Sequence, residues 1–189
     1  IGYDGYASQP SASKMIPTID ISNPIQITAG NIYLKPNFSH DLYSSFRTNN
    51  RETFSFLNAY VNFTMTTRSI VNANWFDNEG VRYSVPVNSK KPQTRGYVYL
   101  TYNRPLGKER RFTLTVSGDV NYTGNYSYQA TSRLEGMNLK SFDYNDFMKN
   151  FWGNSDGDIF YSGQSGFAES RTNTIYWGGD LKLKYSIDK

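Results

Sequence analysis

The stretch from Arg111 to Tyr128, RFTLTVSGDVNYTGNYSY, has a strict two-residue period. The odd-numbered positions, starting at Arg111, are all polar or charged. The even-numbered positions are Phe112, Leu114, Val116, Gly118, Val120, Tyr122, Gly124, Tyr126 and Tyr128. Because successive side chains of a β-strand point to opposite faces, this pattern predicts one long strand with an apolar face and a polar face.

Five other stretches favour the same secondary structure. Residues 57–66 and 174–187 alternate in the same way, and shorter alternating runs cover residues 38–47 and 97–104. The opening residues 1–9 give a weaker sixth strand, and weak strands are also conceivable near residues 24–29 and 159–166. We therefore expect an all-β fold in which long antiparallel strands form a meander.

The predicted strands are longer than those of ordinary soluble sheets. Soluble strands average about 5 to 6 residues, whereas strands that cross a bilayer need about 9 to 11. At about 3.3 Å per residue and a tilt of roughly 45°, the run from Phe112 to Tyr122 rises roughly 23 Å, which matches the apolar band of a transmembrane barrel. The alternative is a large soluble sandwich whose aromatic residues face a closed core.

The connections between strands differ in length. Residues 48–53 and 105–110 are short and turn-like, whereas residues 77–92 and 129–171 form long loops. Outer-membrane barrels place short turns on the periplasmic side and long loops outside the cell. Residues 8–31, which contain three prolines, are expected to form an extended loop, and residues 141–152 a short helix within the longest loop.

These elements predict a single domain over residues 1–189. It consists of a loop-rich segment at 1–37, strand hairpins at 38–128, a long extracellular loop at 129–171 and a last strand at 172–189. Because the chain begins at Ile1 rather than at a methionine, we expect a mature or excised piece of a longer protein.

The composition argues against several kinds of chemistry. Cysteine is absent, which excludes disulfides, thiolate nucleophiles and cysteine-ligated metals. The net charge of +4 comes from scattered lysines and arginines, so nucleic acid is not an expected partner. His40 is the only histidine, and Asn154, Asp156 and Asp158 lack the glycine and the glutamate of a calcium loop. We predict no catalytic residues, no metal site and no cofactor.

Aromatic residues on the long loops are the candidate ligand-binding residues, because flat rings can stack on a sugar or another flat nutrient. Membrane anchoring or packing within the loops is the alternative explanation for them. The candidates are Trp75, Phe76, Tyr83, Trp152, Phe160 and Tyr161.

The stretch from Gly30 to His40, GNIYLKPNFSH, resembles a motif of TonB-dependent receptor barrels of the Bacteroidetes type. That motif reads Gly-Asn-x-x-Leu-Lys-Pro-Glu-x-Ser, and Asn37 stands here in place of its acidic residue. The preceding Pro10-Ser11 segment and the hairpin rhythm that follows are also similar. The resemblance implies a C-terminal portion of an outer-membrane β-barrel, incomplete in this chain.

The resemblance also implies a function. It points to a non-catalytic portion of a receptor or transporter in the bacterial outer membrane that takes part in nutrient binding and TonB-dependent uptake. The implied partners are membrane lipid, the remainder of the barrel and its plug, a small-molecule or glycan nutrient, and a surface lipoprotein. The alternative is a soluble or surface-exposed β-sandwich that binds glycans.

Overall fold

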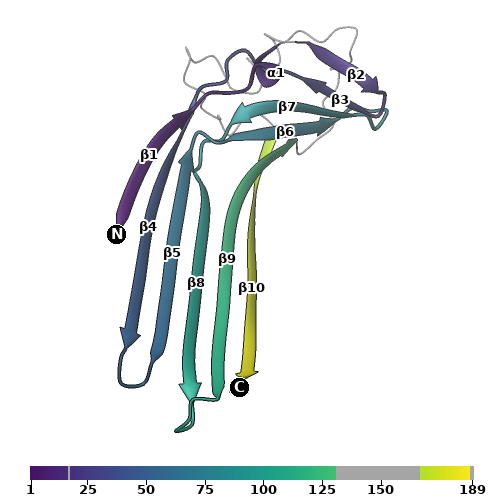
Figure 1. The fold of residues 1–189 in the computed structure, drawn as a ribbon. Coiled ribbons are helices and arrows are strands. Elements are labelled where there is room, and N and C mark those ends of the chain that lie inside the picture. Colours follow the sequence, from purple (N-terminus) through teal and green to yellow (C-terminus); the bar gives the residue numbers. More distant parts are fainter. Residues whose placement is uncertain (17, 131–166, 188–189) are drawn as a thin grey trace.

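The computed structural model describes residues 1–16, 18–130 and 167–187 of the chain. Ten strands form one sheet, in the order β1-β4-β5-β8-β9-β6-β7-β3-β2, with β10 paired to β9 beside this path (Figure 1). The elements are β1 (Gly2–Ser8), α1 (Ala12–Met15), β2 (Ile19–Asn23), β3 (Gln26–Ala29), β4 (Asn37–Asn50), β5 (Ser55–Thr67), β6 (Ile70–Phe76), β7 (Arg82–Asn88), β8 (Gln93–Leu106), β9 (Phe112–Ala130) and β10 (Phe167–Tyr185).

Six of these strands form a tall antiparallel wall, made of β1, β4, β5, β8, β9 and β10 (Figure 1). They are the six strands predicted from alternation, so that prediction is confirmed. The strands reach 19 residues in β9 and β10, long enough to cross a bilayer. The sheet does not close, because β1 pairs only with β4 and β10 only with β9 among the described residues.

The strands of the wall pair in a register that places their apolar positions on one face of the sheet and their polar positions on the other. In one row, Val61, Val98, Val120 and Trp177 lie side by side on four neighbouring strands, and all four are exposed. The next row belongs to the opposite face and reads Tyr43, Asn62, Tyr97, Asn121 and Tyr176. One face is therefore an exposed apolar band and the other is polar, as in a barrel with lipid outside and a polar interior.

The sandwich alternative does not fit this arrangement. A sandwich needs a second sheet that covers the apolar face, but the described strands all belong to one sheet and leave that face exposed. Within the described residues, no helix is both long enough and apolar enough to span a membrane.

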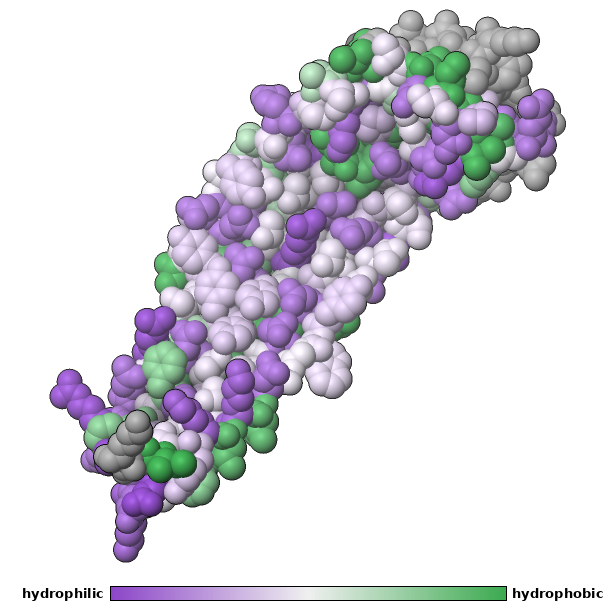
Figure 2. Space-filling model, turned by 45° about the vertical axis from the view of Figure 1, so that its right-hand side comes forward, coloured by the Kyte–Doolittle hydropathy of each residue, from purple (hydrophilic) through white to green (hydrophobic). Residues whose placement is uncertain are grey.

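The remaining elements, α1, β2, β3, β6 and β7, form a compact layer at one end of the wall, which we call the cap (Figure 1). The antiparallel pairs β2–β3 and β6–β7 and the parallel pair β3–β7 hold the cap together, and a parallel contact between β6 and the end of β9 attaches it to the wall. Figure 2 shows hydrophobic side chains gathered over the cap, whereas the wall in that view is mostly hydrophilic or neutral. The buried hydrophobic residues belong to the cap, to the segment before β4 or to the end of β9: Ile27, Ala29, Leu34, Val71, Ala73, Trp75, Tyr83, Val85, Val87 and Tyr128.

The cap corrects two predictions about loops. Residues 8–31, expected to be an extended loop, contain α1, β2 and β3, of which only β3 coincides with the weak strand noted at 24–29. Residues 77–92, also expected to be a loop, contain β7, which pairs with β6 in a hairpin. The longest connection lies between the end of β9 at Ala130 and the start of β10 at Phe167. The helix expected at 141–152 and the weak strand at 159–166 lie outside the described residues.

The motif at residues 30–36 fastens the cap to the wall. A side chain at Gly30 would lie 1.9 Å from the carbonyl oxygen of Ile16, so this position accepts only glycine. The buried Asn31 amide donates to the carbonyl of Pro86 at 2.9 Å and accepts from the backbone of Tyr33 at 2.8 Å. Buried amides need such partners, and these bonds join the segment before β4 to β7.

A second asparagine closes the same junction from the other side. The buried Asn88, the last residue of β7, accepts from the backbone N–H of Lys35 at 2.7 Å and donates to its carbonyl at 2.9 Å. It also donates to the carbonyl of Arg68 at 2.8 Å. The motif that resembles receptor barrels is therefore a structural junction among three segments.

Candidate functional site

A groove of about 600 Å³ lies on the polar face of the wall, directly below the cap. It is formed by β1, β4, β5 and β8 together with residues 9–14 and 69–70. Its lining residues are Tyr6, Ser8, Gln9, Pro10, Ser11, Lys14, Asn37, Ser39, Asp41, Asn62, Thr64, Thr66, Ser69, Ile70, Gln93 and Arg95. Its size is that of a small-molecule site, although its lining is far more polar than usual.

Hydroxyl and amide groups dominate the lining, and two side-chain hydrogen bonds join β4 and β5 there. The Thr64 hydroxyl donates to the Asp41 carboxylate across β4 and β5. One step toward the cap, the hydroxyls of Ser39 and Thr66 lie 3.0 Å apart. The groove therefore presents fixed hydrogen-bonding groups, which lowers the entropy cost of binding a polar ligand.

Two cations line the groove, Lys14 of α1 and Arg95 of β8, and Arg95 lies on the polar face of the wall. In the register it lies between Thr64 of β5 and Thr123 of β9, in the same row as Asp41. Within the described part of the chain, its guanidinium has no hydrogen bond and no ion pair. It is therefore available to a ligand that carries an acceptor, whereas Asp41 is already bonded to Thr64.

A second cavity of about 410 Å³ continues the groove across β8 and β9. The two cavities share Asn62, Thr64 and Arg95, and the second adds Tyr97, Asn121 and Thr123. The row of alternating tyrosines and asparagines described above crosses the wall at this level. A polar path thus leads from the groove along the polar face.

The aromatic residues predicted to bind ligand have different surroundings. Trp75 and Tyr83 are 1% and 5% exposed, and their rings stack at 5.2 Å inside the cap. They line a cavity of only about 10 Å³, the size of one water molecule. Their burial agrees with the alternative explanation, in which these rings pack inside the protein and do not contact a ligand. Phe76, next to Trp75 in β6, is 39% exposed, and Trp152, Phe160 and Tyr161 lie outside the described residues.

Tyr83 is anchored by a carboxylate at the tip of the β6–β7 hairpin. Its hydroxyl donates to Asp77 at 3.0 Å, and the other carboxylate oxygen of Asp77 accepts from the backbone N–H groups of Glu79 and Val81. Burial, followed by the bond to Asp77, raises the pKa of Tyr83 to about 12. At neutral pH the Tyr83 phenol is therefore protonated and donates its hydrogen bond to Asp77.

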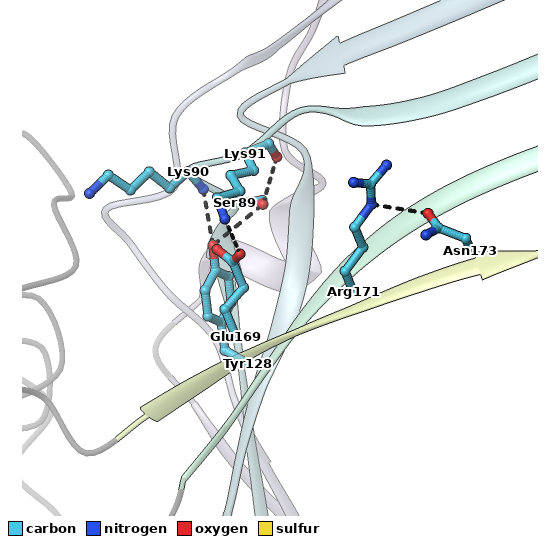
Figure 3. A network of polar contacts seen from close by, with 7 residues as sticks. All are labelled: Ser89, Lys90, Lys91, Tyr128, Glu169, Arg171 and Asn173. Atoms are coloured by element: carbon cyan, nitrogen blue, oxygen red, sulfur yellow. Dashed lines mark hydrogen bonds and ion pairs between the residues drawn. The ribbon is translucent and has the colours of Figure 1, made fainter. Parts of the chain in front are cut away.

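A polar network joins the cap to the wall beside β9 and β10 (Figure 3). The buried Tyr128 hydroxyl of β9 accepts from the backbone N–H of Lys90 at 3.2 Å. Lys91 forms a 2.6 Å ion pair with Glu169 of β10, and the carboxylate raises the pKa of Lys91. These contacts hold the segment between β7 and β8 against the wall and so help to fix the cap above the groove.

The groove residues Asp41, Thr64 and Arg95 were not among the sequence-based candidates. The polar parity of each strand is visible in the sequence, and Arg95 is the one charged residue on the polar parity of residues 93–103. That isolated charge is the signal that could have identified it. His40 belongs to the apolar face of β4. Its Nδ1 atom is hydrogen-bonded to the Tyr3 hydroxyl at 2.8 Å, and its ring packs on Phe38. Among the described residues, no cluster of three or more His, Cys, Asp and Glu side chains could hold a metal.

Comparison with known proteins agrees with the architecture. Residues 2–189 match the outer membrane protein beta-barrel family. No curated protein and no solved structure matches the chain significantly. The family match spans nearly the whole chain, and the open antiparallel wall with an exposed apolar face is that of an incomplete barrel. The chain belongs to the outer membrane protein beta-barrel family and is located in the bacterial outer membrane.

Proposed function

We propose that this chain forms part of the wall of an outer-membrane receptor that binds a polar nutrient below the cap and takes part in its TonB-dependent uptake. The observation that carries the proposal is the groove of about 600 Å³ between the cap and the polar face. It lies at the end of the wall that bears the long connections, which in this class of barrel is the extracellular end. A nutrient arriving from outside would meet this groove first.

The lining favours a ligand with many hydroxyl or carbonyl groups. Asn62 offers both donors and acceptors, Thr64 and Thr66 offer hydroxyls, and Arg95 offers donors without an internal partner. Small molecules and glycans of this kind match the groove better than apolar compounds, whose binding needs apolar walls. The second cavity and the tyrosine–asparagine row continue this chemistry along the polar face.

The aromatic residues Phe76, Trp152, Phe160 and Tyr161 are proposed to make the first contacts with the nutrient. Phe76 lies on the outside of the cap, and Trp152, Phe160 and Tyr161 belong to the connection between β9 and β10. Trp75 and Tyr83 are proposed to act indirectly, because their stacked rings hold the hairpin that carries Phe76. Such a division between packing and contact residues is common in loops that bind ligands.

The proposed dependence of uptake on TonB is supported by the resemblance of residues 30–40 to the receptor motif. The proposed partners are the remainder of the barrel with its plug and a surface lipoprotein. Transport requires no catalytic group in this chain, and the proposed role is binding and passage without a chemical step.

The test combines binding and uptake by the full-length protein. Binding of a panel of neutral and acidic oligosaccharides would be measured by calorimetry in detergent, for the wild type, for Arg95→Leu and for Arg47→Leu. Arg47 lies on the same face, in a row six residues farther from the cap than that of Arg95, and is the matched control. We expect Arg95→Leu to weaken binding by about tenfold or more, as the loss of a charged hydrogen bond does, and Arg47→Leu to leave it nearly unchanged.

Uptake of the best ligand into cells would then be measured with and without an uncoupler of the proton gradient. TonB-dependent uptake should stop with the uncoupler and fall with Arg95→Leu. Uptake that is unchanged both by the uncoupler and by Arg95→Leu would refute the proposal.

A further inference from the structure

The periplasmic end of the apolar face has an aromatic edge. The turns at this end, residues 51–54 and 107–111, are the short ones, which outer-membrane barrels place on the periplasmic side. The last row of the face is formed by Leu106, Phe112 and Tyr185, and the two aromatic rings lie 4.9 Å apart. Aromatic rings on the lipid side mark the level of the lipid headgroups, because they are amphipathic.

Three arginines lie within two residues of this edge along the chain. Arg104 has the parity of the apolar face and lies opposite Leu114, two residues inside the edge. Arg110 and Arg111 lie in the turn between β8 and β9. We call Arg104, Arg110 and Arg111 the arginine cluster.

The cluster is anchored by aromatic contact and is only partly neutralised. The Arg110 guanidinium lies 3.5 Å from the ring centroid of Phe54, which belongs to the neighbouring turn and is itself exposed. Arg111 forms an ion pair with Glu109 at 2.7 Å, but both side chains are largely exposed, so that pair is weak. Arg104 has no ion pair among the described residues.

The charge changes sharply along the apolar face. Between the row of Tyr122 and the row of Leu114, the described strands β4, β5, β8, β9 and β10 carry no charged side chain of this parity other than Arg104. Below it, the two turns carry four cations and two carboxylates: Arg51, Lys108, Arg110 and Arg111, with Glu52 and Glu109. The positive potential is therefore concentrated at the headgroup level.

We propose that the arginine cluster binds the phosphate groups of anionic phospholipids in the periplasmic leaflet. A guanidinium can bind a phosphate with two parallel hydrogen bonds, and a ring such as Phe54 orients it for that contact. The apolar band directly above the cluster accommodates the acyl chains of the same lipid. The partner is thus a membrane lipid with a net negative headgroup, and this site is separate from the nutrient groove of the proposed function.

The test measures which lipids remain bound to the full-length protein. The protein would be reconstituted into vesicles of phosphatidylcholine and phosphatidylglycerol, extracted in mild detergent, and its bound lipids quantified by mass spectrometry. The variant is Arg104→Gln with Arg110→Gln and Arg111→Gln. The matched control is Arg47→Gln with Lys182→Gln and Lys184→Gln, which removes the same charge near the same end of the wall but on the polar face.

We expect the wild type to retain phosphatidylglycerol over phosphatidylcholine, and the cluster variant to lose this preference by about tenfold or more, since each basic residue near an anionic surface is worth about fivefold. The control variant should lose less than about twofold. Should the triple variant lose its β-sheet circular dichroism, Arg110→Gln alone, a change in an exposed turn, is expected to lower the preference by about fivefold.

Three outcomes would overturn the proposal. They are an unchanged preference in the cluster variant, an equal loss in the control variant, and displacement of the lipid by inorganic phosphate beyond the effect of chloride at the same ionic strength. The last result would identify a site for free phosphate rather than for a lipid headgroup.

Discussion

The wall and the cap use apolar residues in opposite ways. Trp75 in the cap is 1% exposed, whereas Trp177 in the wall is 81% exposed. Most of the cap's apolar side chains form a buried core in which Val85 and Val87 are almost fully enclosed. The apolar side chains of the wall, in contrast, point away from the protein along one face.

The difference shows that one chain is adapted to two solvents. The cap follows the rule of soluble domains, in which burial from water drives packing. The wall follows the rule of membrane barrels, in which lipid covers the apolar face and the polar face lines the interior. Four pairs of measurements can test this difference between the two regions.

The largest expected effect concerns the two tryptophans. Trp75→Ala should lower the free energy of opening the cap by about 3–5 kcal/mol, because it removes a buried ring stacked on Tyr83. Trp177→Ala should change it by less than about 0.5 kcal/mol, since that side chain is exposed on the wall opposite Val120. Amide hydrogen exchange of β7 in the full-length protein measures both values. Equal effects would contradict the distinction between the two regions.

An added positive charge should destabilise the protein more on the apolar face of the wall than on the polar face. Leu100→Arg introduces a cation into the middle of the apolar band, and we expect a loss of about 2–4 kcal/mol in folding free energy. The neighbouring Thr101→Arg faces the polar side and should cost less than about 0.5 kcal/mol. Urea titration of the protein in lipid vesicles measures the two changes. A costlier Thr101→Arg would reverse the assignment of the faces.

The junction between cap and wall should depend on Asn31. Asn31→Ala leaves the buried carbonyl of Pro86 without its 2.9 Å donor, and we expect the cap-opening free energy to fall by about 1–3 kcal/mol. Asn72→Ala, at an exposed position of β6, is the control and should have little effect. Hydrogen exchange of β6 and β7 gives the measurement. An Asn31→Ala variant that exchanges like the wild type would show that the motif does not fasten the cap.

The smallest effect is a dependence of cap stability on alkaline pH. The pKa of Tyr83 is raised from its ordinary 10.0 to about 12, so the folded cap favours the neutral phenol. This contribution is fully present below pH 10 and is lost as the pH rises from 10 through 12. Cap opening in the wild type should therefore increase over that interval more than in Tyr83→Phe. Parallel pH profiles for the two proteins would exclude Tyr83 as the cause.

The sequence predicts the wall better than the cap for a physical reason. Each wall strand has one apolar and one polar face, so alternation identifies all six strands. In β7, six consecutive residues from Tyr83 to Asn88 are buried, and a strand enclosed on both faces shows no alternation. In β6, Val71, Ala73 and Trp75 do alternate with Asn72 and Asn74, so the sequence carries a signal for this strand.

The candidate site was less accessible to prediction because it depends on register. Asp41, Thr64 and Arg95 lie in one row only because β4, β5 and β8 pair without any shift along their length. A slip of one residue would move every one of these side chains to the other face. Alternation in the sequence predicts which residues share a face. Which residues of neighbouring strands lie opposite one another depends on the turns and on the pairing along the whole strand.

Quenching of tryptophan fluorescence by lipids with brominated acyl chains measures directly whether the exposed apolar face of the wall contacts lipid. The full-length protein in such vesicles would carry Trp152→Phe together with either Trp75→Phe or Trp177→Phe, which leaves one of this chain's three tryptophans. Bromine should strongly quench the protein that retains Trp177, because that ring is 81% exposed on the apolar face. The protein that retains the buried Trp75 should be almost unaffected. An unquenched Trp177, or quenching of Trp75 to the same extent, would contradict the assignment of the exposed apolar face to lipid.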